Sequence, residues 1–244
     1  MDGSILRCTG VTKRFGGVSA LENVDVVAER GGILGIIGPN GSGKTTLLNV
    51  ISGIYQPTAG RIECQGKDIT GLPAFRVSRE GIARTFQNIR LFRNLSCEEN
   101  VLVGLHNKTK WWRPNSAATS RAYEMLDFVG LATKRSVTSS SLPYGEQRKL
   151  EIARALAADP EILLLDEPAA GMGGREAEDL VTLFMRVNGM GKTLIIIDHN
   201  MKVIMNLVDR VMVLDAGAKI QEGTPQQIQA DEQVRSIYLG TSVC

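Results

Sequence analysis

The stretch Gly38-Pro39-Asn40-Gly41-Ser42-Gly43-Lys44-Thr45 decides the fold of this 244-residue chain. It fits the pattern G-x-x-x-x-G-K-[ST], in which glycines let successive backbone N–H groups converge on a phosphate. An aliphatic run at 33–37 predicts a buried strand before the loop, and apolar residues with helical spacing at 45–54 predict a helix after it. The positive end of that helix would point at the same phosphate. The pattern therefore predicts a nucleotide-phosphate loop, with Lys44 at the β- and γ-phosphates and the Thr45 hydroxyl on Mg²⁺.

Two more aliphatic runs, at 162–165 and 193–197, are each followed at once by acidic or histidine residues. Between them, apolar residues at 177–184 have helical spacing. Strands that alternate with helices predict an α/β fold with a mainly parallel sheet. In such sheets ligands bind beyond the carboxyl ends of the strands, which is where these polar residues fall.

The middle and the end of the chain show other patterns. Residues 88–159 have helical patterns and polar loops without a clear strand, which predicts a helical lobe inserted into the α/β core. The segment 111–116, which begins with Trp111 and Trp112, interrupts this lobe, and packing within the lobe or contact with a membrane partner or lipid headgroups are both open. Residues 211–220 predict a hairpin, and Thr224 and Pro225 are expected to cap and begin a last helix.

The composition narrows the classes of protein. Hydrophobic residues make up 43% and charged residues 22% of the chain, which is a globular balance and excludes a disordered chain. The net charge of +2 gives no basic field that would favour nucleic acid. The sequence has no run of 18 apolar residues and no apolar signal segment, so we expect no membrane span. We expect free thiols in a reducing cytoplasm, because no metal or redox spacing relates Cys8, Cys64, Cys97 and Cys244.

Asp166 and Glu167 directly follow the aliphatic run at 162–165. Two carboxylates at the end of a strand suit a metal ion and an attacking water beside a phosphate. We expect Asp166 to hold Mg²⁺, and Glu167 to orient and polarise the water as a general base. The plainer alternative is a solvated strand end, because strands often end in aspartate. The presence of Lys44 on a phosphate loop favours the catalytic interpretation.

The stretch Leu142-Pro143-Tyr144-Gly145-Glu146-Gln147-Arg148 leads into a run with helical spacing. It resembles the signature motif of ABC ATPases, usually LSGGQ followed by a basic helix, and it lies shortly before Asp166, where that family places it. Taken alone, it would be an ordinary helix start with proline in its first turn. The resemblance implies that Tyr144, Gly145 and Glu146 are presented to the γ-phosphate held by a second subunit.

The same resemblance assigns roles to other residues. Gln87 matches the Q-loop, which links the γ-phosphate and Mg²⁺ to the transmembrane partner, and His199 matches the switch histidine at the γ-phosphate. Phe15 matches the aromatic residue that stacks on adenine, although it could also be an ordinary phenylalanine near a turn. The implied catalytic residues are therefore Glu167, His199 and Gln87, and the implied metal ligands are Thr45, Gln87 and Asp166. The implied phosphate-binding residues are Gly38, Pro39, Asn40, Gly41, Ser42, Gly43, Lys44, Thr45 and Thr46.

For the whole chain, the resemblance implies a single ABC ATPase domain over residues 1–244. This fold is an α/β P-loop NTPase with a RecA-like core and a mainly parallel sheet. It also has an N-terminal antiparallel β part and an inserted α-helical subdomain, here at 88–159. The implied cofactors are ATP and Mg²⁺.

The match is closer than the superfamily level. Segments at 84–93, 150–156, 166–171 and 198–202 look like branched-chain amino acid importer ATPases of the LivG type, and the resemblance spans residues 11–240. It implies a subunit that hydrolyses ATP to ADP and phosphate in a sandwich dimer and drives uptake of branched-chain amino acids or related small polar solutes.

This importer resemblance also implies partners and a location. The partners are a second ATPase subunit, two transmembrane permease subunits and, indirectly, a solute-binding protein, with no nucleic acid. Residues 87–95 are the expected contact with the permeases. The chain is expected to be a peripheral subunit at the cytoplasmic face of the inner (plasma) membrane.

Three positions depart from the family pattern. Pro143 stands where many signatures have serine, Tyr144 replaces one signature glycine, and Gly173 stands where many members have aspartate. Because Pro143 and Gly173 fall at contact positions across the dimer, we expect the second ATPase to be a non-identical paralogue, with a homodimer as the alternative.

Other functions remain open at this point. One is the ATPase of a lipid or lipopolysaccharide ABC transport system. Another is a soluble, non-transport ABC ATPase that acts on nucleic acid, which the single phosphate loop and the net charge of +2 disfavour. A P-loop small-molecule kinase would share the phosphate loop, but it would have no need of the signature stretch or of His199.

Overall fold

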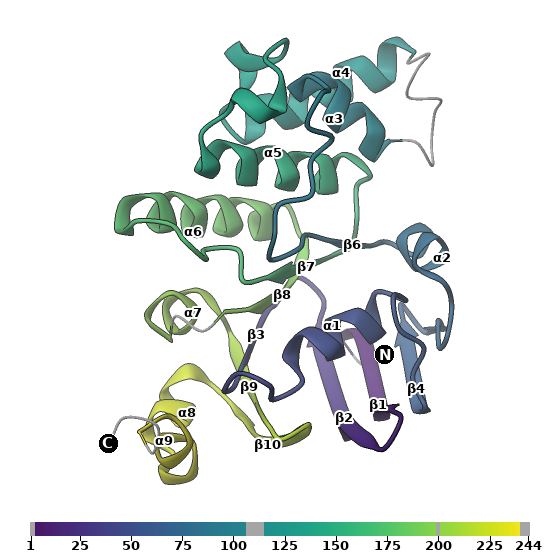
Figure 1. Cartoon of the computed structure of the whole chain (residues 1–244), viewed down its shortest axis with the longest axis vertical. Helices are drawn as coiled ribbons and strands as arrows, with labels where there is room; N and C mark the ends of the chain where they lie inside the picture. The colour runs from purple at the N-terminus through teal and green to yellow at the C-terminus, as the bar shows by residue number, and fades with distance from the viewer. Residues whose placement is uncertain (1–2, 106–114, 199–200, 240–244) are drawn as a thin grey trace.

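The structure is a computed structural model, and it describes residues 3–105, 115–198 and 201–239. Two β-sheets enclose helix α1 (Lys44–Ile51), and a helical lobe extends beyond them at the top of Figure 1. Both faces of the larger sheet are covered, and each face has its own apolar core.

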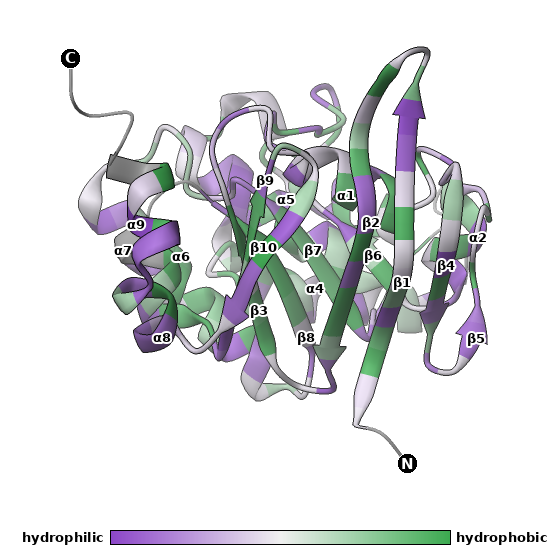
Figure 2. Ribbon diagram, turned by 90° about the horizontal axis from the view of Figure 1, so that it is seen from below, coloured by the Kyte–Doolittle hydropathy of each residue, from purple (hydrophilic) through white to green (hydrophobic). Residues whose placement is uncertain are grey.

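The larger sheet carries the phosphate loop. Its order is β10-β9-β3-β8-β7-β6, and every pairing except β9 with β10 is parallel. Strands β3, β7 and β8 are buried along their whole length, as expected of parallel strands that are covered on both faces (Figure 2). The predicted α/β fold and the terminal hairpin are confirmed. The strands are β3 (Ile33–Ile37), β6 (Ile82–Arg84), β7 (Ile162–Asp166), β8 (Thr193–Ile197), β9 (Arg210–Asp215) and β10 (Ala218–Gly223).

The smaller sheet is the antiparallel β part that the resemblance implied. Its order is β2-β1-β4-β5, and its apolar side chains pack with α1 and one face of the larger sheet. The strands are β1 (Ser4–Phe15), β2 (Val18–Glu29), β4 (Ala59–Cys64) and β5 (Lys67–Asp68).

Helix α1 is shorter than the 45–54 that the sequence predicted. It ends at Ile51, and Gly53 takes a left-handed backbone with φ of +73°. The predicted end of this helix is wrong, because Ile54, the last residue of the predicted range, lies beyond the turn and is 42% exposed. The apolar spacing in the sequence continues past Ile51, but the helix ends there because Gly53 turns the chain.

Helix α6 (Gly174–Gly189) covers the other face of the larger sheet through Leu180, Leu183, Phe184 and Val187. The prediction for the last part of the chain is confirmed, since the Thr224 hydroxyl accepts the Gln227 N–H and Pro225 begins α8. The remaining helices outside the lobe are α2 (Ala74–Arg79), α7 (Met201–Leu207), α8 (Pro225–Ala230) and α9 (Glu232–Leu239).

The helical lobe is formed by α3 (Cys97–Gly104), α4 (Ser116–Phe128) and α5 (Tyr144–Ala157), with short 3₁₀ turns at Ala132–Lys134 and Ser139–Ser141. In the described part of residues 88–159 no strand occurs, and the boundaries of the subdomain stay a prediction. Helices α3 and α5 pack closely at Gly104, where a Cβ atom would lie 2.3 Å from the Arg154 carbonyl oxygen.

Among the described residues, no helix has the length and apolar character needed to cross a bilayer. Cys8, Cys64 and Cys97 are buried free thiols, and burial raises the pKa of Cys8 to about 12 and that of Cys64 to about 11. These two thiols are therefore protonated and unreactive at neutral pH. Trp111, Trp112 and Cys244 lie outside the described residues.

Candidate active site

The phosphate loop joins β3 to α1 and takes a shape that glycine alone allows at two points. Gly38 and Gly43 have φ of +155° and +100°, and a Cβ at either position would lie within 2.6 Å of a backbone carbonyl oxygen. Gly43 is also the N-cap of α1, and no side chain caps this helix. The first N–H groups of α1 therefore face the loop without a side-chain acceptor, which is the arrangement that binds an anion.

Lys44 lies inside this loop. Its ammonium group donates to the carbonyl oxygens of Gly38 and Pro39 at 2.8 and 2.9 Å, and the residue is 6% exposed. Burial lowers the pKa of Lys44, and the nearby carboxylates of Glu167 and Asp166 oppose this shift. A cation is thus held where the loop would bring a polyphosphate.

Asp166 ends β7 beside the first turn of α1. Its Oδ1 atom is 3.5 Å from the Thr45 hydroxyl oxygen, and its Oδ2 atom accepts a hydrogen bond of 2.8 Å from Arg84 Nη2. Asp166 is 2% exposed. The sequence analysis predicted that Asp166 and Thr45 lie together, but it gave no role to Arg84.

Glu167 and Gln87 come from the ends of neighbouring parallel strands. Gln87 Nε2 donates to Glu167 Oε2 at 2.8 Å, and the Glu167 N–H donates to the Ile197 carbonyl oxygen at 2.8 Å. Glu167 has a φ of +44°, a conformation that is costly for a residue with a side chain and that clusters at functional sites. The proposed base and the Q-loop glutamine therefore meet at the carboxyl end of the sheet.

The Q-loop backbone is fastened to the helical lobe by a buried ion pair. The Arg148 guanidinium donates to the carbonyl oxygens of Phe86 and Gln87 and to Glu151 Oε2, each at 2.7 Å. Glu151 Oε1 accepts the Arg90 N–H at 3.1 Å. The Arg148 side chain is 0% exposed and that of Glu151 is 1% exposed. The lobe and the segment that carries Gln87 are thus joined by charge-assisted hydrogen bonds.

The signature stretch begins α5, away from the phosphate loop of its own chain. Figure 1 places α5 above strands β7 and β8 and α1 below them. Pro143 caps α5 without a side-chain hydrogen bond, and the exposed Tyr144 donates its hydroxyl to the Ala170 carbonyl oxygen at 3.3 Å. Glu146 forms an ion pair of 2.6 Å with Lys134. Tyr144, Gly145 and Glu146 therefore lie together, but not beside the loop.

Phe15 stands at the end of β1 and is 43% exposed. Its ring meets that of Tyr55 edge to face at 5.2 Å between centroids, and the Lys13 ammonium lies 4.8 Å from the Phe15 centroid. An exposed ring of this kind suits stacking on a base. Tyr55 was missed by the sequence reasoning, because nothing in its local pattern separates it from an ordinary surface residue. His199 lies outside the described residues, so its predicted place beside the γ-phosphate stays a prediction.

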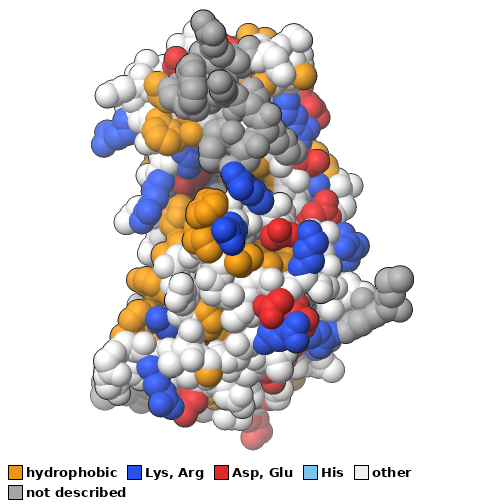
Figure 3. Space-filling model, turned by 90° about the vertical axis from the view of Figure 1, so that its right-hand side faces the viewer, with side chains coloured by type: hydrophobic (Ala, Val, Ile, Leu, Met, Phe, Trp, Pro, Cys, Tyr) orange, Lys and Arg blue, Asp and Glu red, His pale blue; other side chains and the backbone are white. Residues whose placement is uncertain are grey.

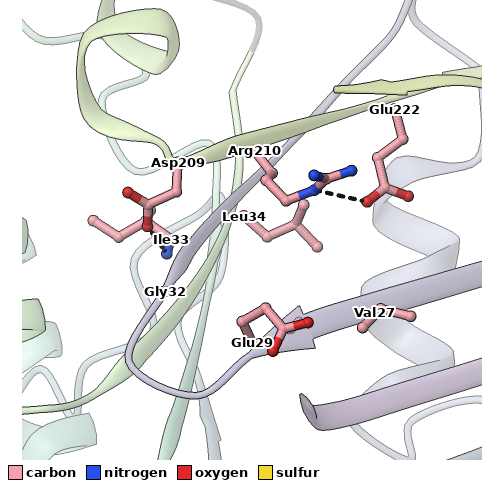
Figure 4. A pocket seen from close by; sticks show the side chains of 9 residues that line it. Val27, Glu29, Gly32, Ile33, Leu34, Asp209, Arg210 and Glu222 are labelled. Atoms are coloured by element: carbon pink, nitrogen blue, oxygen red, sulfur yellow. Dashed lines mark hydrogen bonds and ion pairs between the residues drawn. The ribbon is translucent and has the colours of Figure 1, made fainter. Parts of the chain in front are cut away.

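A cavity of about 490 Å³ lies elsewhere, at the amino end of β3 (Figure 4). Asp209 Oδ2 there accepts the Ile33 N–H at 2.8 Å, and Arg210 forms an ion pair of 3.2 Å with Glu222. None of the predicted nucleotide-binding residues lines it. A larger cavity of about 730 Å³, lined among others by Ser4, Arg7 and Glu63, does not include them either, so cavity size does not locate a site at the phosphate loop.

The loop, the two carboxylates and the glutamine at the carboxyl end of a parallel sheet define a P-loop nucleotide-binding protein. The sequence model described as "ABC transporter" matches residues 21–170, and one described as "Branched-chain amino acid ATP-binding cassette transporter" matches residues 218–243. The chain belongs to the ABC transporter family, and it is an ATPase of the ABC type.

Curated relatives match the chain over its whole length. The high-affinity branched-chain amino acid transport ATP-binding protein BraF of Pseudomonas aeruginosa is 39% identical, with 98% of this chain and 99% of the relative covered. The protein LivG of Escherichia coli, described in the same words, has the same identity and coverage. A probable LivG of Archaeoglobus fulgidus is 32% identical, with 97% of this chain and 95% of the relative covered.

Solved structures share the fold. The ADP conformation of an ATP-binding cassette of an ABC transporter superposes with a TM-score of 0.91 at 31% identity, covering 97% of this chain and 99% of that one. A dimeric ATP-binding cassette in a post-hydrolysis state with ADP and Pi superposes with a TM-score of 0.80 at 28% identity, covering 90% and 98%.

Proposed function

We propose that the chain is the ATP-binding and hydrolysing subunit of an ABC importer for branched-chain amino acids or related small polar solutes. The observation that carries this proposal is the full-length similarity to BraF and LivG, together with the branched-chain transporter model over residues 218–243. The latter segment lies outside the cassette match at 21–170. It therefore favours this importer over a lipid or lipopolysaccharide system and over an ATPase that acts on nucleic acid.

The phosphate loop, from Gly38 to Thr46, would bind the ATP phosphates through its backbone N–H groups and the Lys44 ammonium. Phe15 would stack on the adenine ring. Thr45 and Asp166, with Gln87, supply the oxygen donors that Mg²⁺ prefers, and in the described ranges no cluster of three His, Cys, Asp or Glu side chains offers a resident metal site. The ion would thus arrive with ATP, and it would neutralise charge on the phosphates.

Glu167 would act as the general base. Its carboxylate is aligned by the hydrogen bond from Gln87, and its backbone is fixed by the bond to Ile197. A carboxylate held in this way can orient a water at the γ-phosphate and accept its proton. His199, which follows β8, would contact the γ-phosphate. The residues of one chain thus supply the loop, the base and the metal ligands.

The remaining part of each site would come from a second ATPase subunit. Tyr144, Gly145 and Glu146 stand at the uncapped start of α5, which can present backbone N–H groups to the γ-phosphate held by the partner. Pro143 offers no hydroxyl, and Gly173 offers no side chain at the start of α6. These two positions favour a non-identical paralogue as partner. Recovery of only a symmetric homodimer from the native complex would contradict that pairing.

The permeases would dock in a groove of about 330 Å³ between the α2–β6 region and the helical lobe. Its lining includes Phe86 and Phe92, and the guanidinium groups of Arg90 and Arg154 lie over these rings at 4.1 and 5.7 Å. Figure 3 shows hydrophobic side chains flanked by Lys and Arg on the face that carries α2. Such a surface suits an apolar helical segment, and it overlaps the predicted contact at 87–95. Docking would hold the chain at the cytoplasmic face of the membrane.

Purification of the tagged chain from detergent-solubilised membranes tests this proposal. We expect a second ATPase chain and two permease subunits to co-purify, and we expect the complex in liposomes to import leucine only with ATP and a solute-binding protein. A complex that moves lipid but no amino acid would support the lipid system instead. Co-purification with nucleic acid alone would contradict transport altogether.

A further inference from the structure

Arg84, the last residue of β6, has a buried guanidinium that contacts three residues on two other elements. Its Nη2 atom donates to Asp166 Oδ2 at 2.8 Å, and its Nη1 atom donates to Asn49 Oδ1 at 2.7 Å and to Ser52 Oγ at 3.0 Å. The Arg84 side chain is 5% exposed and that of Asp166 is 3% exposed. Arg84 is thus anchored on α1 and at the same time pairs with a carboxylate at the carboxyl end of β7.

Because of this pairing, the two oxygens of the Asp166 carboxylate face different partners. Oδ2 is engaged by Arg84, whereas Oδ1 faces the Thr45 hydroxyl at a distance too long for a strong hydrogen bond. Asp166 can therefore offer one oxygen toward Thr45, and it cannot turn both oxygens to the same side while the pair holds. The fixed fork of a guanidinium, anchored by Asn49 and Ser52, sets this orientation.

We propose that Arg84 is a positioning residue, which orients the Asp166 carboxylate and weakens its binding to the metal ion of bound nucleotide. The inference rests on the proposed role of Asp166 as a metal ligand. A buried carboxylate without a counter-charge attracts a cation strongly, because little water screens it. Arg84 supplies that counter-charge permanently, so Asp166 binds the ion with one oxygen and loosely enough to release it with ADP in each cycle.

Loss of Arg84 should change metal affinity in a direction that loss of an ordinary structural residue would not. Loss of the Arg84 charge should make metal binding tighter, whereas a general loosening of the site would make it weaker. The same loss should slow turnover, because the freed carboxylate no longer points one oxygen at Thr45 and releases the ion more slowly. Affinity for the metal and the rate of hydrolysis are thus expected to change in opposite directions.

The test uses the purified full-length chain, saturated with a non-hydrolysable ATP analogue, and Mn²⁺ as the probe. Free Mn²⁺ is measured by its electron paramagnetic resonance signal. We expect Arg84→Gln to bind Mn²⁺ about tenfold more tightly than wild type, since one nearby positive charge is removed. Arg84→Lys, which keeps the charge but not the fork, should tighten binding only about threefold. Nucleotide affinity in EDTA should stay within about twofold of wild type.

Arg135→Gln is the matched control. The Arg84 guanidinium lies 5.0 Å from the ring centroid of Phe86, and that of Arg135 lies 4.0 Å from the ring centroid of Tyr123 in the helical lobe. This variant loses the same charge and the same kind of ring contact, so its Mn²⁺ affinity should equal that of wild type. A tightening here as large as in Arg84→Gln would show that net charge alone is responsible, and it would overturn the proposal.

A double-mutant cycle with Asp166→Asn completes the test. The tightening caused by Arg84→Gln should vanish in the Asp166→Asn background, because the two residues act on one carboxylate. Unchanged or weaker Mn²⁺ binding by folded Arg84→Gln, or the same tightening without Asp166, would overturn the proposal. If Arg84→Gln does not fold, Arg84→Lys is measured in its place. Mn²⁺ binding about threefold tighter than wild type would then support the proposal, and wild-type affinity would overturn it. A wild-type chain that binds neither the analogue nor Mn²⁺ would instead contradict the proposed function.

Discussion

The phosphate loop and the Q-loop segment lie at the same end of one sheet, yet they are held in different ways. Residues 38–45 are shaped mainly by their own backbone, with positive φ at Gly38, Gly41 and Gly43 and the Lys44 ammonium bonded to two loop carbonyls. The segment 84–90 depends on side chains from distant parts of the chain. Arg148, 62 residues after Phe86, holds its carbonyl, and Arg84 pairs with Asp166, 82 residues away.

This difference suggests how the two regions work. The phosphate loop can bind phosphate in any arrangement of the lobe, because its outside support comes from the β core, where the Gly217 N–H donates to the Ser42 carbonyl oxygen at 3.1 Å. The Q-loop can hold its place only while α5 and the Arg148–Glu151 pair hold theirs. Since α5 also begins with the signature stretch, movement of Gln87 and movement of the signature are expected to be coupled.

Lys44→Ala should have the largest effect, because it removes the only charged side chain of the phosphate loop. We expect nucleotide binding to weaken by at least about 100-fold, as loss of charge-assisted hydrogen bonds to phosphate implies. Calorimetric titration with ATP measures this directly. Lys67→Ala, which removes an exposed lysine paired with Glu80, serves as the control. Unchanged affinity in Lys44→Ala would remove the basis for assigning the loop.

The Lys44 ammonium also gives a pH dependence. The charged form binds phosphate, and burial lowers the pKa of Lys44 below its usual value of 10.5. Affinity for ATP should therefore begin to fall at a lower pH than an exposed lysine would allow. Titrations at rising pH check the direction.

Arg148→Leu should have an intermediate effect, this time on the segment held by side chains. It leaves the buried Glu151 with only the longer ion pair to Arg154, at 3.9 Å, and the carbonyls of Phe86 and Gln87 without the Arg148 donor. We expect a loss of about 3 kcal/mol in the free energy of unfolding, measured by urea denaturation. The double variant Arg148→Leu/Glu151→Leu should recover part of it, because the buried carboxylate is removed as well. A change below about 1 kcal/mol in the single variant would mean that the pair does not hold the Q-loop.

Tyr144→Phe should have the smallest effect. It removes only a hydroxyl on an exposed side chain, which donates to the Ala170 carbonyl oxygen at 3.3 Å and accepts a long contact of 3.5 Å from Arg148 Nη2. We expect a loss of about 0.5–1.5 kcal/mol in stability and a change in ATPase rate of less than about threefold. Tyr144→Gly restores the more common signature residue and provides the comparison. A collapse of activity in Tyr144→Phe would give this hydrogen bond a role that the comparison of the two regions does not predict.

The same contrast explains what the sequence could predict. The loop and the start of the helix follow from eight consecutive residues, and the strand before them follows from the aliphatic run at 33–37. The carboxylates of Asp166 and Glu167 follow from where another strand ends. Their meeting with Gln87 was expected from family resemblance, and the distance of 2.8 Å between Gln87 and Glu167 agrees with it. Patterns of this kind can be recognised in the sequence, because each element is determined by residues close together in the chain.

Arg84 and Arg148 could not be found in this way. Each is an ordinary basic residue in its local sequence, and its importance arises from partners that only the tertiary structure brings near. The end of α1 was misplaced for a related reason, since the apolar spacing ran on to Ile54 while Gly53 turned the chain. Sequence patterns thus predicted the groups proposed to contact nucleotide, but not the residues that hold those groups in place.

In the proposed function one chain holds only half of each complete site, so we expect ATP to bring two ATPase chains together. Glu167→Gln tests this expectation, because it leaves the phosphate loop unchanged and removes the proposed base. The mass of this variant is measured by analytical ultracentrifugation with ATP and Mg²⁺, alone and with its co-purified ATPase partner. We predict a stable two-chain species with ATP that separates with ADP. A one-chain mass under all conditions, together with normal turnover by Glu167→Gln, would contradict this expectation.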